Sequence, residues 1–110
     1  MDAEKAEDTT ELGGNISLAG FKELDYKDLI IIKKIVGSET RRISEQLSDF
    51  QRITLTLKPV HKVEDNQKNE LHVKIVAEGK VYTAEVTDKN IFFALDAAFK
   101  KIHAQIQQKH

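Results

Sequence analysis

The fold is decided by residues 71–108, which read LHVKIVAEGKVYTAEVTDKNIFFALDAAFKKIHAQIQQ. Apolar and polar residues alternate over 71–77 and again over 80–86, as they do in strands that bury one face. Glu78-Gly79 lies between the two runs and predicts a two-residue turn, because glycine adopts backbone angles that other residues avoid. A helical pattern follows, so this stretch predicts an antiparallel hairpin leading into an amphipathic helix.

The position of the turn sets the register of the hairpin. Closing the chain at Glu78-Gly79 places Ala77 opposite Lys80 and His72 opposite Glu85. The large apolar side chains then share one face, and the other face carries His72, Lys74, Thr83 and Glu85. A third alternating run at residues 51–58 extends the buried face with Ile53, Leu55 and Leu57, and a polar loop over residues 63–70 joins it to the hairpin. The sequence therefore predicts a three-stranded meander with one solvated face.

Two helices are expected to cover the apolar face. The first begins after Asp25, a residue type that caps helices, and its apolar stripe comprises Leu29, Ile32, Val36, Thr40, Ile43, Leu47 and Phe50. Gly37 interrupts the stripe, and the alternative is a strand over residues 29–36 followed by a helix from Ser38. One long helix is favoured because the stripe keeps its phase across Gly37. The second helix starts near Thr87-Asp88 and packs through Phe92, Leu95, Phe99, Ile102 and Ile106.

The predicted fold class is α+β. An edge strand within residues 16–24 completes a four-stranded, mostly antiparallel sheet with two helices on one face, in the order β-α-β-β-β-α. This order is similar to that of the double-stranded RNA-binding domain. We expect one domain over residues 15–110 and a disordered acidic leader over residues 1–14, which hold five acidic residues and one lysine. The remaining chain holds sixteen basic and thirteen acidic residues, so a mildly basic domain follows the leader.

Composition and spacing exclude several classes of function. The chain has no cysteine, which removes disulfides and thiolate metal sites and fits a cytoplasmic location. No apolar run approaches the roughly 18 residues that a membrane span needs, and the acidic start has no apolar signal core. The histidines show no metal-ligand spacing, the serines no nucleophile context and the glycines no phosphate-binding fingerprint. We expect no enzyme and no cofactor, and we interpret His72 and Glu85 as a surface pair.

Basic residues support a binding function. Lys27, Lys34 and Arg41 are spaced seven apart along the solvent side of the first helix, and Lys33 and Arg42 flank them. Such a stripe neutralises successive phosphates of a nucleic acid, and binding of this kind weakens as salt rises. The alternative is an ordinary solvated helix face, balanced by Glu39, Glu45 and Asp49. The predicted phosphate contacts are Lys34, Arg41, Arg42, Lys74, Lys100 and Lys101, and recognition is expected to follow RNA shape and backbone.

The order strand–helix–three strands–helix over residues 15–110 resembles the ribosome hibernation promoting factor and ribosome-associated inhibitor A family, and residues 85–110, EVTDKNIFFALDAAFKKIHAQIQQKH, carry the specific part of the resemblance. Residues 90–96 stand in place of that family's Asp-Met-Tyr-x-Ala-Ile-Asp-like helix start, and residues 101–106 in place of its Lys-Leu-x-x-Gln-Leu segment. Lys101 matches a basic family position, whereas Ala104 and Gln108 replace an arginine and a lysine. The resemblance implies a partner, the ribosomal RNA of the small ribosomal subunit in its decoding channel, and a role in silencing idle ribosomes.

Two other functions stay open at the level of sequence. A double-stranded RNA-binding domain shares the element order, but the start of its last helix carries a lysine cluster where this chain has only Lys89. A protein-interaction or self-association module, such as a homodimer, would use Ile31, Ile35 and Phe93, which fall off the core stripes. Salt sensitivity separates RNA binding from the apolar association.

Overall fold

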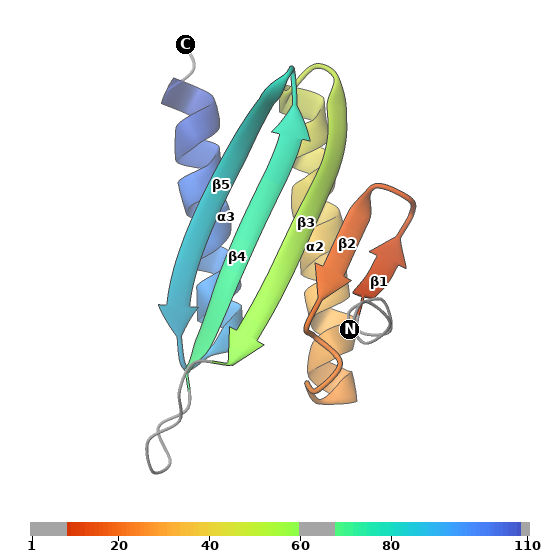
Figure 1. Ribbon diagram of the computed structural model, residues 1–110, viewed down its shortest axis with the longest axis vertical. Coiled ribbons are helices and arrows are strands. Elements are labelled where there is room, and N and C mark those ends of the chain that lie inside the picture. The colour runs from red at the N-terminus through yellow and green to blue at the C-terminus, as the bar shows by residue number, and fades with distance from the viewer. Residues whose placement is uncertain (1–8, 60–67, 109–110) are drawn as a thin grey trace, which may run out of the picture.

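The computed structural model describes residues 9–59 and 68–108, which form an α+β fold of one five-stranded sheet and two helices (Figure 1). The strands are β1 (Thr9–Leu12), β2 (Ile16–Ala19), β3 (Phe50–Pro59), β4 (Asn69–Ala77) and β5 (Lys80–Asp88), and the helices are α2 (Tyr26–Gln46) and α3 (Ile91–Gln108). The strands lie side by side in chain order. Within the described residues, neither helix is long and apolar enough to span a membrane.

The sheet is mixed but mostly antiparallel. β3, β4 and β5 form the predicted meander and β1 pairs antiparallel with β2, whereas β2 runs parallel to β3. Parallel neighbours need a long crossover, and α2 provides it between β2 and β3. The predicted register of the last hairpin is confirmed, with Ala77 opposite Lys80 and His72 opposite Glu85. Its turn has positive φ at both Glu78 and Gly79, 59° and 70°.

The prediction of four strands is wrong, because residues 9–12 add a fifth. This strand, β1, lies within residues 1–14, the segment expected to be a disordered leader, so the predicted domain boundary at residue 15 falls inside the sheet. Gly13 and Gly14, with φ of 68° and 86°, turn β1 back onto β2, which is therefore an inner strand and not the predicted edge strand. Residues 1–8 and 109–110 lie outside the described residues.

α2 confirms the single long helix and excludes a strand over residues 29–36. The Asp25 carboxylate accepts a hydrogen bond from the Lys27 backbone N–H at the N-terminus, and the helix continues through Gly37 without interruption. It ends at Gln46, earlier than the predicted stripe, because Phe50 already belongs to β3.

α3 begins later than predicted, because residues 87–88 still belong to β5. Asn90 caps this helix: its side-chain oxygen accepts hydrogen bonds from the backbone N–H groups of Phe92 and Phe93. β4 starts at Asn69, inside the polar loop predicted over residues 63–70, and residues 60–67 of that loop are not among the described residues.

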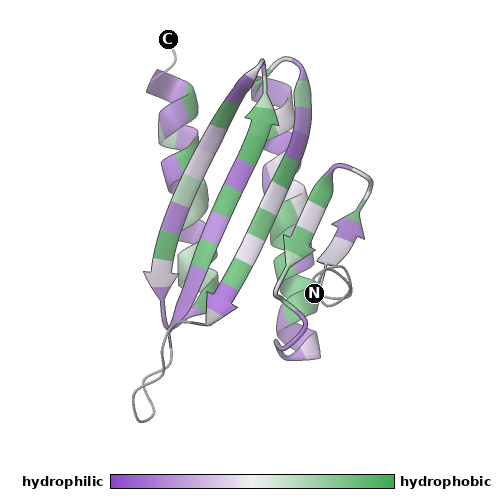
Figure 2. Cartoon of the chain, viewed as in Figure 1, coloured by the Kyte–Doolittle hydropathy of each residue, from purple (hydrophilic) through white to green (hydrophobic). Residues whose placement is uncertain are grey.

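The core lies between the sheet and the two helices, which both cover the same face (Figure 1). Hydropathy alternates along β3, β4 and β5, as Figure 2 shows, and the apolar positions of each strand point toward the helices. The fully buried members include Ile32, Val36, Ile53, Leu55, Leu71, Ile75, Leu95 and Ile102. The predicted architecture of one covered and one open sheet face is therefore confirmed.

Candidate functional site

The open face of the sheet is built from polar rows that cross neighbouring strands. Thr54 of β3 lies opposite Lys74 of β4, which lies opposite Thr83 of β5. The next row contains Thr56, His72 and Glu85. Because residues that face each other across a sheet share a face, each row presents its side chains to solvent on the side away from the helices.

A hollow of about 640 Å³ lies over these rows. We call it the open-face hollow; its side chains come from β3, β4, β5 and α3, and its polar members are Thr54, Thr56, Lys58, His72, Lys74, Thr83, Glu85 and Lys101. Three lysines and three threonines therefore line one surface. Both kinds of side chain donate hydrogen bonds to phosphate oxygens.

Lys101 reaches this surface from α3 around the outer edge of β5. Its Nζ lies 3.0 Å from the backbone oxygen of Glu85, and Gln105 of the same helix donates to the backbone oxygen of Thr83. These two bonds occupy outward-facing carbonyl groups of an edge strand, which would otherwise be open to pairing with another chain. They also hold the Lys101 ammonium group at the rim of the open-face hollow.

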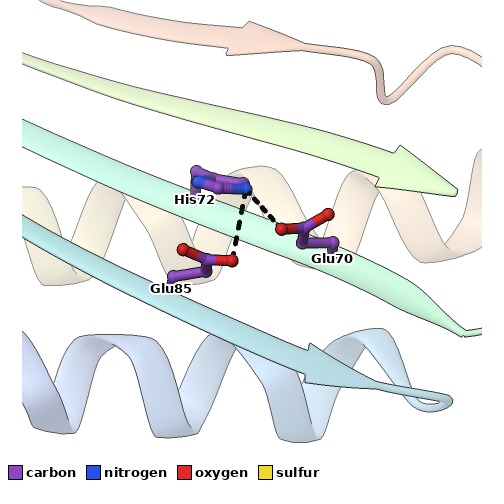
Figure 3. Close-up of side chains that lie close together, drawn as sticks. All are labelled: Glu70, His72 and Glu85. Carbon is purple, nitrogen blue, oxygen red and sulfur yellow. Dashed lines mark hydrogen bonds and ion pairs between the residues drawn. The ribbon is translucent and has the colours of Figure 1, made fainter. Parts of the chain in front are cut away.

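A compact acid–histidine cluster lies on the same face (Figure 3). His72 Nε2 lies 3.0 Å from Glu70 Oε2 and 3.9 Å from Glu85 Oε2. A hydrogen bond with the Glu85 carboxyl group, and after it the hydrogen bond with His72, lowers the pKa of Glu70 from its ordinary value. The predicted pair of His72 and Glu85 thus has a third member, Glu70, which precedes His72 by two residues on β4.

Three of the predicted phosphate contacts form ion pairs on the helices. Arg41 lies 3.8 Å from Glu45, and Arg42 lies 3.5 Å from Glu39. On α3, Lys100 Nζ lies 3.1 Å from Asp96 Oδ2. Exposed pairs of this kind contribute little to stability, but each acid cancels the charge of its basic neighbour at distances that matter to a polyanion.

The structure brings together only two of the predicted contacts, Lys74 and Lys101, at the open-face hollow. Lys34 is exposed on α2, and it forms no ion pair with another residue of the described ranges. Lys58 was missed by the sequence analysis. The signal for it was present, because alternation over residues 51–58 puts Lys58 on the same side of the strand as Thr54 and Thr56.

Arg52 is the remaining basic residue of β3, and β1 engages it. Its guanidinium group lies 2.7 Å from both carboxylate oxygens of Glu11 and also donates to the Ser17 hydroxyl group. The Ser17 hydroxyl donates to Glu11 at 2.6 Å. The hydrogen bonds from Ser17 and then from Arg52 lower the pKa of Glu11. This network fastens β1 to β2 and β3.

The sequence matches no protein-family model and no curated protein. Membership of the ribosome hibernation promoting factor family stays a prediction.

Proposed function

We propose that this protein binds the ribosomal RNA of the small ribosomal subunit through its phosphate backbone and thereby modulates translation in the cytoplasm. The supporting observation is the convergence of Lys58, Lys74 and Lys101 on the open-face hollow, where Thr54, Thr56 and Thr83 add hydroxyl donors. Lysine and threonine contact phosphates but carry little sequence information, so recognition follows the shape of the RNA.

The charge balance favours the open face over the helices as the RNA surface. Three lysines meet one lining carboxylate, that of Glu85, in the open-face hollow. Glu70 adds a second carboxylate nearby, and it lies opposite Lys58 in the strand pairing. On the helices, by contrast, Arg41, Arg42 and Lys100 each have an acid within 4 Å.

Lys101 connects this surface with the proposed ribosomal partner. It is the basic residue that matches the family resemblance of residues 85–110, and it also lines the open-face hollow. The ribosomal part of the proposal depends on that resemblance, whereas the phosphate-binding part depends on the geometry of the open face.

Two matched triple variants test the proposal. One replaces Lys58, Lys74 and Lys101 by glutamine, and the other replaces Lys34, Arg41 and Lys100 by glutamine, so each removes three positive charges. Binding to purified small ribosomal subunits is measured by sedimentation over a series of salt concentrations. The open-face variant should bind more weakly, and the slope of log K against log salt should flatten by about 2 to 3, because each phosphate contact contributes roughly one.

The helical triple variant should retain the affinity and the salt slope of the wild type. A larger loss in the helical variant would contradict the assignment of the open face. Absence of wild-type binding to small subunits at low salt would overturn the ribosomal partner, and unchanged binding to a generic RNA hairpin in both variants would overturn the phosphate contacts.

We propose self-association through the helices as a second candidate function, because large apolar side chains are exposed there. Ile31 of α2 is 48% exposed and Phe93 of α3 is 65% exposed, while Ile35 is half-buried. Association through such residues is insensitive to salt. A dimer that persists in high salt and dissociates in the Ile31→Ser, Phe93→Ser variant supports this function; a monomer at all concentrations contradicts it.

A further inference from the structure

Glu70, His72 and Glu85 present three ligand atoms of the kinds that bind metal ions. The His72 ring nitrogen Nε2 lies between two carboxylates, at 3.0 Å from Glu70 Oε2 and 3.9 Å from Glu85 Oε2 (Figure 3). One atom from each residue falls within 4.8 Å of the other two. In a tetrahedral zinc site with bonds of about 2.1 Å, neighbouring ligand atoms lie roughly 3.4 Å apart. The separations of 3.0 Å and 3.9 Å therefore need changes of roughly 0.4 to 0.5 Å, and a separation of up to 4.8 Å needs a change of at most about 1.4 Å.

The strand pairing holds the three residues in place. Glu70 and His72 are two residues apart on β4, so they share a face, and Glu85 lies directly opposite His72 on β5. The Glu85 backbone oxygen accepts a hydrogen bond from Lys101 at the outer edge of β5. The N–H and C=O groups of Glu85 therefore point away from β4. His72 and Glu85 consequently form the closer, non-hydrogen-bonded type of cross-strand pair.

The imidazole distinguishes this cluster from a group of surface acids. A single His72 Nε2 faces both carboxylates, and one ring nitrogen donates a proton to only one of them. The second carboxylate therefore has no donor from this ring. A cation that contacts all three atoms at once serves both carboxylates and uses the nitrogen as a ligand.

We propose that Glu70, His72 and Glu85 bind a divalent transition-metal ion, with Zn²⁺ the best match, on the open face of the sheet. One imidazole and two carboxylates suit first-row transition metals, whereas Mg²⁺ prefers oxygen ligands and retains its water. Three protein ligands leave a fourth position toward solvent, as in open zinc sites. This proposal does not rest on RNA binding: His72 and Glu85 also line the open-face hollow, but the test below uses the metal ion alone.

The test is a calorimetric titration of the full chain with ZnCl₂, compared with His72→Ala, Glu85→Gln and the control His103→Ala. His103 contacts a single carboxylate, that of Glu39 at 2.8 Å, and has no second one in the described part of the chain within ion-pair distance. We expect His72→Ala to lose one bound Zn²⁺ per chain and Glu85→Gln to bind it about tenfold or more weakly. His103→Ala should bind as the wild type does.

Visible absorption of Co²⁺ provides a second readout, because a change in its d–d spectrum on binding reports the ligands directly. The wild type should show this spectrum, and His72→Ala should not. Equal Zn²⁺ stoichiometry and affinity in the wild type and His72→Ala would overturn the proposal, as would a preference for Mg²⁺ over Zn²⁺.

Discussion

The open sheet face and the helical face both carry exposed basic residues, but they differ in where the acids lie. On the helices, acids stand three or four residues from basic residues, and the helical repeat brings them together, as in Arg41 with Glu45 and Lys100 with Asp96. On the sheet, Lys74 stands between Thr54 and Thr83 across the strands. For these residues, an acid at helical spacing accompanies the helical cation, whereas hydroxyl groups accompany Lys74.

The two sides of β4 should differ clearly in how much their residues contribute to the free energy of unfolding. Ile75 is fully buried under the helices and Lys74 is exposed on the open face. Ile75→Ala should lower the free energy of unfolding by about 3 kcal/mol, because it leaves a cavity in the core. Lys74→Ala should change it by less than about 0.5 kcal/mol. Urea denaturation followed by circular dichroism measures both, and equal effects would contradict the division into covered and open faces.

Reversing one charge on each face should affect RNA binding to different extents. Lys74→Glu should weaken the binding of an RNA hairpin at low salt by about tenfold, because it replaces a phosphate contact by a repulsive charge. Lys34→Glu, with the same change of charge on α2, serves as the control and should have a smaller effect. Fluorescence anisotropy measures both affinities. A greater loss of affinity in Lys34→Glu than in Lys74→Glu would indicate that α2, and not the open face, contacts the RNA.

Removing the acids of the helical face should reduce the difference in RNA binding between the helical face and the open face. The variant Glu39→Gln, Glu45→Gln, Asp96→Asn frees Arg41, Arg42 and Lys100 from their ion pairs. Affinity for the same hairpin should rise several-fold and should gain salt dependence, because additional cations become available. An unchanged affinity would show that the ion pairs do not prevent the basic residues of the helices from binding RNA.

Acid pH should weaken the interactions that hold β1 to β2 and β3. The pKa of Glu11 lies below its ordinary value of 4.5, since Ser17 and Arg52 stabilise the carboxylate. Its stabilising contribution is therefore complete above the unfolded-state pKa and is lost as pH falls through the lowered folded-state pKa. The stability difference between wild type and Glu11→Gln should be constant near neutral pH and shrink toward zero in acid. A difference that grows in acid would contradict the network.

Much of the meander and both helices were predictable from local patterns. Period-two alternation and the turn at Glu78-Gly79 predicted the pairing of His72 with Glu85, and the phase of the stripe across Gly37 predicted one long α2. β1 was missed because Glu11 reads as a solvated acid in an acidic segment. Its partner Arg52 is 41 residues away, and no local pattern connects them.

The candidate site was only half predictable for a similar reason. The alternation shows that Lys58 and Lys74 each lie on an open side of a strand, but their proximity depends on the pairing of β3 with β4. The position of Lys101 depends on a side chain that reaches around β5 to the Glu85 backbone oxygen. The acids that pair with Arg41 and Lys100, Glu45 and Asp96, stand four residues from them at helical spacing, so both ion pairs were predictable from the sequence.

Mapping the bound RNA on the protein by nuclear magnetic resonance tests most directly whether the open face is the binding surface. An RNA hairpin is titrated into isotope-labelled protein, and backbone amide shifts are followed. We predict the largest changes at residues 54–58, 72–74 and 83–85 and at Lys101, and small changes over residues 34–42. Changes concentrated on α2 and at Lys100, with the open-face strands unmoved, would contradict the account.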